Sequence, residues 1–233
     1  MPCTLPASLA DAAVCRGSFH AVLGGEVEDT AFADFSAALQ KAQAEGRILT
    51  ASLFRYENHL FFYAEGLNRP FTPQGLCPAL DAALLPWPPA LGEAAPRPWA
   101  AMQPYFYHDV PTTAADWQQG RCPQRRRGRI ALLPPDSWCS YMEHHLRIVT
   151  EGLVEGDRWH LICVQEGVLF SYLEEPRTNV NIRHQPGAHS PELDAWIAAD
   201  PESHFARFTP EQKAHPDSGH NFVFLPRIAG TED

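Results

Sequence analysis

The sequence predicts an α+β protein built from two tandem β-α-β-β-α-β units. The first observation is an internal repeat of three segments in the same order: residues 57–65, 77–82 and 104–107 are similar to residues 166–174, 190–195 and 221–224. The second observation is that the offset between matching residues grows slowly, from 109 (Leu60 to Leu169) to 116 (Phe106 to Phe222). A duplicated domain with small loop insertions explains both.

The first half opens with an apolar run, residues 17–23, that is typical of a strand. A helix is predicted over residues 28–45, where apolar residues recur every three or four positions, and Gly46 is expected to end it. The remaining elements are a hairpin, a short helix and a final strand, predicted over residues 47–56 with 59–65, residues 78–85 and residues 102–108.

The second half repeats this order. After a strand over residues 128–133, Asp136 is the expected N-cap of a helix that runs to residue 151 and ends at Gly152. A hairpin, a helix and a last strand follow, predicted over residues 158–165 with 168–174, residues 191–199 and residues 221–226.

These elements predict a first repeat over residues 14–111, a linker over residues 112–127 and a second repeat over residues 128–228. The linker contains the basic run Arg125-Arg126-Arg127, which is expected to be solvated; an anion-binding patch is the functional alternative.

Composition excludes several classes of function. The formal net charge of -10 disfavours nucleic-acid binding, and no apolar run approaches the roughly 20 residues that a membrane span needs. The first 13 residues lack a basic segment followed by an apolar run, so no secretory signal is predicted and the expected location is the cytoplasm. The six cysteines form no CxxC pair, and the histidines form no HExxH, so neither a disulfide framework nor a metal site is predicted.

A β-α-β-β-α-β unit is ferredoxin-like: it forms a four-stranded antiparallel sheet with both helices on one face. The bare faces of two such sheets can cover one another, as in the dimeric α/β-barrel superfamily. Because the internal repeat supplies both sheets, a monomer with an internal pseudo-dimer is expected, and a homodimer remains open.

The residues that could carry chemistry lie in the second half. Tyr141 and His145 are separated by four positions and therefore share one helix face. A histidine can act as an acid or a base near neutral pH, and a tyrosine can donate or relay a hydrogen bond. The structural alternative is that Tyr141 packs on the sheet and His145 is a hydrogen-bonded boundary residue.

Residues 128–226 resemble the L-rhamnose mutarotase family, as a tandem duplication. The resemblance rests on a Tyr-x-x-x-His pattern at Tyr141, a glycine after that helix, an aromatic residue at Trp159, the Leu-Phe-x-x-x-Glu pattern at Leu169, and the Val-Phe-Leu-Pro ending at Val223. In the first copy Phe35 and Leu39 stand at the positions of the tyrosine and histidine, so that copy is expected to be degenerate and structural.

The resemblance implies an isomerase that interconverts the anomers of a rhamnose-like aldose without a cofactor or metal. His145 would be the acid/base and Tyr141 its partner, and the monosaccharide would contact five further side chains: Trp159, His160, Trp196, His204 and Phe205.

One departure leaves other functions open. The family's paired tryptophans would fall near His204-Phe205, where this sequence has none. The alternatives are a small-ligand-binding or structural protein without turnover, and a dimeric α/β-barrel monooxygenase.

Overall fold

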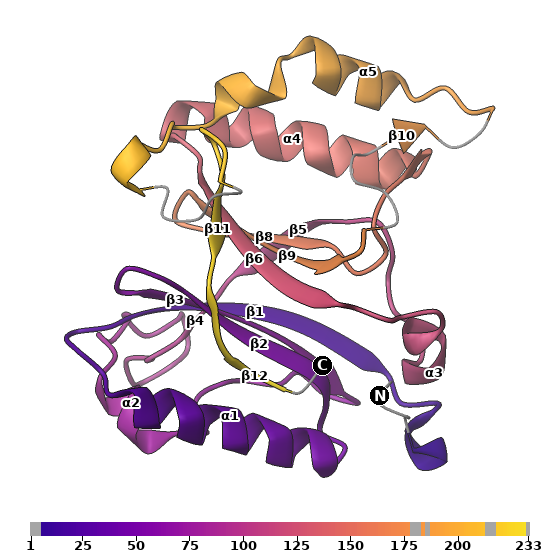
Figure 1. The fold of residues 1–233 in the computed structure, drawn as a ribbon. Coiled ribbons are helices and arrows are strands. Elements are labelled where there is room, and N and C mark those ends of the chain that lie inside the picture. Colours follow the sequence, from indigo (N-terminus) through magenta and orange to yellow (C-terminus); the bar gives the residue numbers. More distant parts are fainter. Residues whose placement is uncertain (1–5, 178–182, 185–186, 213–217, 232–233) are drawn as a thin grey trace. The chain divides into compact units, whose positions relative to one another are not determined.

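The computed structural model describes residues 6–177, 183–184, 187–212 and 218–231 (Figure 1). The chain forms two compact units, each made of segments that are distant in sequence. Unit 1 comprises Met1–Met102, Pro111–Pro123 and Pro226–Asp233, and unit 2 comprises Gln103–Val110 and Gln124–Leu225.

Unit 1 contains a five-stranded antiparallel sheet with the strand order β12-β2-β3-β1-β4. Its strands are β1 (Val14–Val22), β2 (Ile48–Tyr56), β3 (His59–Leu67), β4 (Ala100–Ala101) and β12 (Arg227–Gly230). The helices α1 (Asp29–Ala44) and α2 (Pro78–Ala82) lie on one face of this sheet (Figure 1). A 3-10 turn, η1 (Ala7–Leu9), and a short helix, α3 (Ala114–Gln118), complete the unit.

Unit 2 has the same plan, with the strand order β11-β6-β9-β8-β5. Its strands are β5 (Gln103–Tyr107), β6 (Arg125–Leu132), β8 (Leu161–Gln165), β9 (Val168–Glu175) and β11 (Val223–Leu225). The helices α4 (Pro135–Glu151) and α5 (Pro191–Ala198) lie on the same face of the sheet (Figure 1). The smaller elements are β7 (Val154–Glu155), β10 (Arg183–His184), η2 (Pro201–His204) and η3 (Pro210–Gln212).

The predicted fold class is confirmed: the protein is α+β, with two ferredoxin-like units. Within each repeat the strands are ordered 4-1-3-2, and a fifth strand is added beside strand 2. No helix in the described part of the chain is both long and apolar enough to cross a membrane.

The fifth strand of each sheet comes from the end of the other repeat. β5 follows β4 directly along the chain but pairs with β8, and β12 follows β11 but pairs with β2. The prediction that residues 102–108 form the last strand of the first sheet is therefore wrong, because that place is taken by the two-residue strand β4. For the same reason the predicted ranges 14–111 and 128–228 do not coincide with the compact units.

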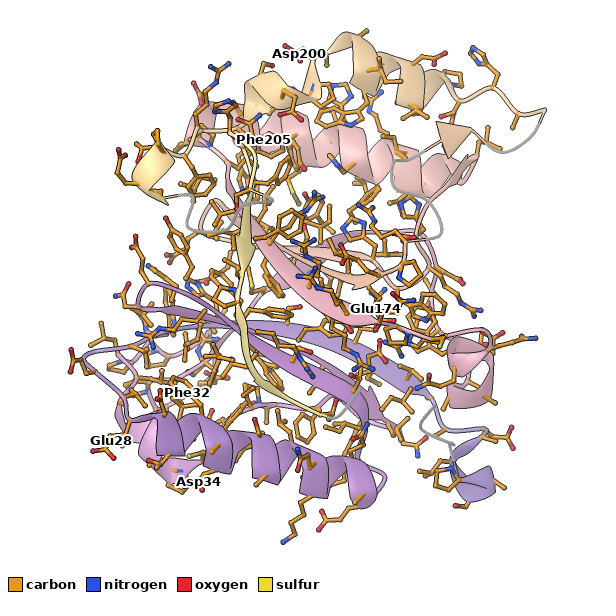
Figure 2. All side chains as sticks on the ribbon, viewed as in Figure 1. Glu28, Phe32, Asp34, Glu174, Asp200 and Phe205 are labelled. Atoms are coloured by element: carbon orange, nitrogen blue, oxygen red, sulfur yellow. The ribbon has the colours of Figure 1, made fainter. Side chains whose placement is uncertain are left out.

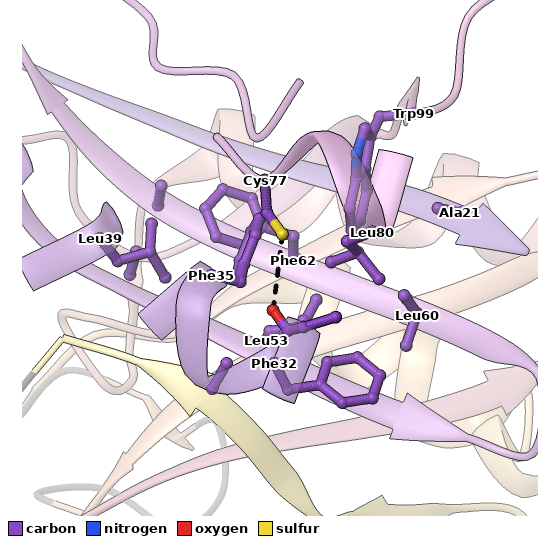
Figure 3. Packing of buried hydrophobic residues seen from close by; sticks show 14 of the residues in the cluster. Ala21, Phe32, Phe35, Leu39, Leu53, Leu60, Phe62, Cys77, Leu80 and Trp99 are labelled. Atoms are coloured by element: carbon purple, nitrogen blue, oxygen red, sulfur yellow. Dashed lines mark hydrogen bonds between the residues drawn. The ribbon is translucent and has the colours of Figure 1, made fainter. Parts of the chain in front are cut away.

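Helix α1 forms as its apolar spacing predicts. Phe35 and Leu39 are fully buried and belong to the hydrophobic core of unit 1, together with Phe62 and Trp99 (Figure 3). Phe32 lies on the side of α1 toward the sheet, whereas Asp34 points away from it (Figure 2). The two positions that correspond to Tyr141 and His145 are thus filled by core packing in unit 1.

The predicted linker is ordered structure. It contains α3 and the first strand residues of β6, which begins at Arg125. The expectation that the basic run is solvated is corrected, because Arg127 is buried and its Nη1 lies 2.8 Å from Oε1 of Glu175 on the neighbouring strand β9. Arg126 lies opposite Glu174 in the same pair of strands.

The end of this segment completes a buried ionic network in unit 1. Glu65 on β3 accepts two hydrogen bonds from the Arg121 guanidinium, at 2.7 and 3.0 Å, and one from Trp117 Nε1 at 3.0 Å. The Tyr63 hydroxyl donates to it at 2.7 Å and itself accepts from Arg16 Nε at 3.0 Å. Burial alone would raise the pKa of Glu65, but Arg121 foremost, then Arg16 and Tyr63, lower it below its ordinary value.

Candidate ligand site in the second unit

Unit 2 contains a cavity of about 340 Å³ between its sheet and its helices. The sheet contributes Phe106 and Ile162, and α4 and α5 contribute Tyr141, His145 and Trp196. Phe205, which follows η2 and is labelled in Figure 2, closes one side. Cavities of this size are at the lower end of the range for small-molecule sites in proteins.

Helix α4 positions the two residues that the sequence singled out. Pro134 is the N-cap and Pro135 is the first residue of the helix. The prediction of Asp136 as the N-cap is therefore wrong, because Asp136 is the second residue of the helix. Gly152 ends the helix as predicted, in a left-handed conformation with φ 68°. The spacing of four residues places Tyr141 and His145 on the buried face, with ring centroids 4.2 Å apart.

The protonation state of His145 follows from its contacts. Its Nδ1 lies 2.9 Å from the backbone carbonyl oxygen of Tyr141, which can only accept, so Nδ1 carries the proton and donates. In the neutral ring Nε2 is then an acceptor, and within the described part of the chain no hydrogen-bond partner reaches it. Burial, the largest cause, lowers the pKa of His145 to about 4.

Aromatic rings surround His145. The centroids of Trp196 and Phe106 lie 4.7 and 4.8 Å from its own, and that of Tyr105 lies at 5.5 Å. Burial raises the pKa of Tyr141 to about 12 and, with the neighbouring Tyr141, raises the pKa of Tyr105 well above 10. Both phenols therefore keep their protons at neutral pH.

A cation lies in the wall of this apolar cavity. Arg129 on β6 is half-buried, its Nε is buried without a hydrogen bond, and its guanidinium lies 4.4 Å from the centroid of the Phe222 ring. Burial and then repulsion by Arg177 lower the pKa of Arg129 to about 10, so it remains charged at neutral pH. Among the residues that the structure describes, no carboxylate forms an ion pair with it.

A second group of polar side chains lines the cavity near the turn before β8. Asp157 is buried and its Oδ2 lies 2.5 Å from Nε of Arg177. The His108 imidazole packs directly over Gly156, where an added Cβ would meet its Nε2 at 1.9 Å. Burial lowers the pKa of His108. The described residues contain no cluster of three or more His, Cys, Asp or Glu side chains that could hold a metal.

This packing gives a testable result for Gly156→Ala. The new methyl group should displace His108 from the cavity wall, and the pKa of His108 should rise toward 6.5 as its ring gains water. Titration of the His108 imidazole followed by NMR measures this. The control is Gly219→Ala, since no atom lies within 4 Å of a Cβ built at Gly219. An unchanged His108 titration in Gly156→Ala would contradict the packing.

The structure brings most of the predicted site residues together. Five line the cavity: Tyr141, His145, His160, Trp196 and Phe205. His204 lies behind it, with Nε2 3.3 Å from Ser140 Oγ and its ring centroid 6.0 Å from that of Tyr141. Trp159 is not part of the lining. Trp159 and His160 were expected to begin a strand, but they lie in a turn closed by a hydrogen bond from His160 N to Asp157 O, and β8 begins at Leu161.

Sequence reasoning missed Arg129, Asp157, Arg177 and His108. A signal existed only for Arg129, because strand alternation places it on the same side as Ala131 and Leu133, which are core residues of unit 2. A charged residue on the core-facing side of a strand is unusual unless it has a partner or a function.

Comparison with known proteins supplies no family. No family model matches the chain, and no curated protein matches it. Two solved structures are similar, each named “putative monooxygenase”. The protein from Fusobacterium nucleatum is 9% identical, with a TM-score of 0.40 and 95% of each chain covered. The protein from Lactobacillus acidophilus is 8% identical, with a TM-score of 0.34 and coverage of 94% of this chain and 96% of that one. At these identities, the comparison concerns the fold alone.

The prediction of a sugar mutarotase is corrected. The similar structures bear the name of a monooxygenase, which was among the alternatives, and not of a mutarotase. The site gives a physical reason for the correction. General acid–base catalysis of hemiacetal opening is most efficient when the pKa values of the acid and the base lie near the working pH. The pKa of His145 is about 4 and that of Tyr141 is about 12, so neither group changes its protonation near pH 7.

Proposed function

We propose that unit 2 binds a compact organic anion with an aromatic or otherwise apolar body. The observation that carries this proposal is Arg129, a charged guanidinium in an apolar cavity with no ion-pair partner among the described residues. Burial and repulsion from Arg177 lower the pKa of Arg129, and the charge of Glu202, which also lines the cavity, acts in the opposite direction without forming an ion pair with Arg129. An anionic ligand would supply the missing counter-ion.

The cavity walls favour the body of such a ligand. The rings of Phe106, Tyr141, Trp196 and Phe205 line the space and offer both faces and edges to a flat molecule. A carboxylate or a similar anion next to Arg129 would form charge-assisted hydrogen bonds, which are about twice as strong as neutral ones. Mostly apolar walls with a few polar and charged groups are the usual composition of a small-molecule site.

Binding alone is the function that this geometry supports best. A monooxygenase acting on an organic substrate would begin with the same binding step, so this proposal is compatible with either alternative to the mutarotase.

The test is a comparison of benzoate with benzamide, which has nearly the same shape without the charge. Isothermal titration should show benzoate binding to the wild type more tightly than benzamide, and Arg129→Met should weaken benzoate about 10- to 100-fold, because a hydrogen bond to a charged group contributes about 1.5–3 kcal/mol. Without ligand, Arg129→Met should raise the Tm, since it removes a charge that has no partner in the described structure.

The matched control is Arg147→Met, on the exposed face of the same unit, where the guanidinium pairs with Glu143 and is 55% exposed. It should leave benzoate binding unchanged. Equal affinities for benzoate and benzamide, or an Arg129→Met protein that binds benzoate as the wild type does, would overturn the proposal.

A further inference from the structure

We propose that the ligand carries, besides its anionic group, a neutral hydrogen-bond donor that reaches Nε2 of His145, so that the natural ligand is a compact hydroxy acid rather than a simple acid. This inference rests on the proposed function and narrows the class of ligand that the same cavity takes.

The orientation of the His145 ring is fixed by a hydrogen bond to the backbone. The hydrogen bond from Nδ1 to the Tyr141 carbonyl oxygen, at 2.9 Å, holds the ring and its tautomer. Nε2 can then only accept. His145 is 4% exposed and lines the cavity, and in the described structure no protein donor is within hydrogen-bonding distance of Nε2. Nε2 is not among the fully buried polar atoms that lack a partner, so it is open to the cavity and can accept from a donor there, such as a ligand hydroxyl.

The two polar groups lie on different walls. Arg129 projects from β6 in the sheet, and His145 projects from α4. Tyr141 lines the same cavity as both groups, and its ring centroid lies 4.2 Å from that of His145. A molecule that lies between sheet and helix with its anionic end at Arg129 therefore presents its other end to the helix wall.

The chemistry of Nε2 excludes a second anion at that end. Near neutral pH the imidazole is neutral, so a second carboxylate would face a lone pair and not a donor. A hydroxyl group donates to such a nitrogen, whereas a methoxy group of similar position cannot. The site should therefore select hydroxy acids over both diacids and ethers.

The experiment compares four probes on the wild type: benzoate, 3- and 4-hydroxybenzoate, and the methoxybenzoate that matches the better of the two. The hydroxyl should strengthen binding about 3- to 10-fold relative to benzoate, as one net hydrogen bond does, and the methoxy group should not. In His145→Leu the advantage of the hydroxyl should vanish while benzoate still binds. Leucine is chosen because Leu39 occupies the corresponding position of unit 1. The control His189→Gln changes an exposed histidine and should keep the advantage.

The outcomes separate the two proposals. If benzoate binding depends on Arg129 but the hydroxy and methoxy probes bind equally, the hydroxy-acid inference fails and the anion site stands. If hydroxybenzoate still binds His145→Leu more tightly than benzoate does, His145 is not the acceptor of the hydroxyl hydrogen bond and the inference fails. If none of the acids binds, the proposed function itself fails. If His145→Leu does not fold, the comparison of the hydroxy and methoxy probes on the wild type still tests the hydroxy-acid inference.

Discussion

Glu65→Gln should lower the free energy of unfolding by about 3–5 kcal/mol, the range found when one partner of a buried ion pair is removed. The substitution keeps the shape of the side chain but removes its charge, so Arg121, which is buried and bound through both nitrogens, would be left without its counter-ion. The Trp117 and Tyr63 hydrogen bonds to Glu65 would be weakened at the same time. Urea denaturation of the variant and the wild type measures the difference.

Glu45→Gln is the matched control, because Glu45 pairs with Arg47 at the surface and its side chain is 45% exposed. Exposed pairs contribute less than about 1 kcal/mol. The pH dependence gives a second check. Because the pKa of Glu65 is lowered by folding, its stabilisation is complete above the ordinary pKa and is lost as pH falls through the folded value. Glu65→Gln should lack this acid-dependent part. A loss no larger than that of Glu45→Gln would show that the network does not stabilise the fold.

Acid should destabilise the protein through His145 at a higher pH than through Glu65. Folding lowers the pKa of His145 from 6.5 to about 4, so between these values the unfolded chain binds more protons than the folded one. Stability therefore rises with pH across this window and is complete above about 6.5. The full difference is about 3 kcal/mol, because one pKa unit corresponds to about 1.4 kcal/mol. Urea denaturation at a series of pH values between 4 and 7 measures it.

His145→Leu removes the titrating group, so its stability should vary with pH by about 3 kcal/mol less than that of the wild type over the same window. His189→Gln, at a side chain that is 77% exposed, should retain the wild-type profile. If His145→Leu loses as much stability as the wild type on acidification, His145 is not the group responsible, and its burial as a neutral ring is contradicted.

The local parts of the fold could be predicted from the sequence because their signals are local. The stripe through Phe35 and Leu39 and the glycines Gly46 and Gly152 define two helices and their ends, and both glycines have positive φ. The hairpin turns at Glu57 and Glu166 were also found, and both residues are in the left-handed conformation that a tight turn requires. A helix with apolar residues every three or four positions, and a tight turn, can each be predicted without knowing which distant segments they pack against.

The parts that were missed depend on pairing between distant segments. Residues 103–107 read as a strand, but nothing in their pattern says that they pair with β8 rather than with β1. Helix α3 has only five residues, too few for a periodic pattern, and is held by Trp117 and its bond to Glu65.

The residues of the candidate site also divide into those with a local sequence signal and those that only the fold brings together. Tyr141 and His145 could be predicted because they lie four positions apart on one helix. Arg129, Asp157 and His108 come from three other segments, and only the folded sheet brings them to one cavity. The lowered pKa of His145 is a property of its burial and could not be read from residue type.

The exchange of β5 and β12 makes each sheet depend on both repeats. Deleting the first copy would remove β5 and leave β8 as an unpaired edge in the unit that holds the cavity, while deleting the second would strip β12 from β2. The sheet that forms the floor of the cavity in unit 2 therefore depends on a strand that the first repeat supplies. The first repeat can thus serve the cavity through its strand β5 while its own helix α1 holds only core residues, such as Phe35 and Leu39, at the positions of Tyr141 and His145.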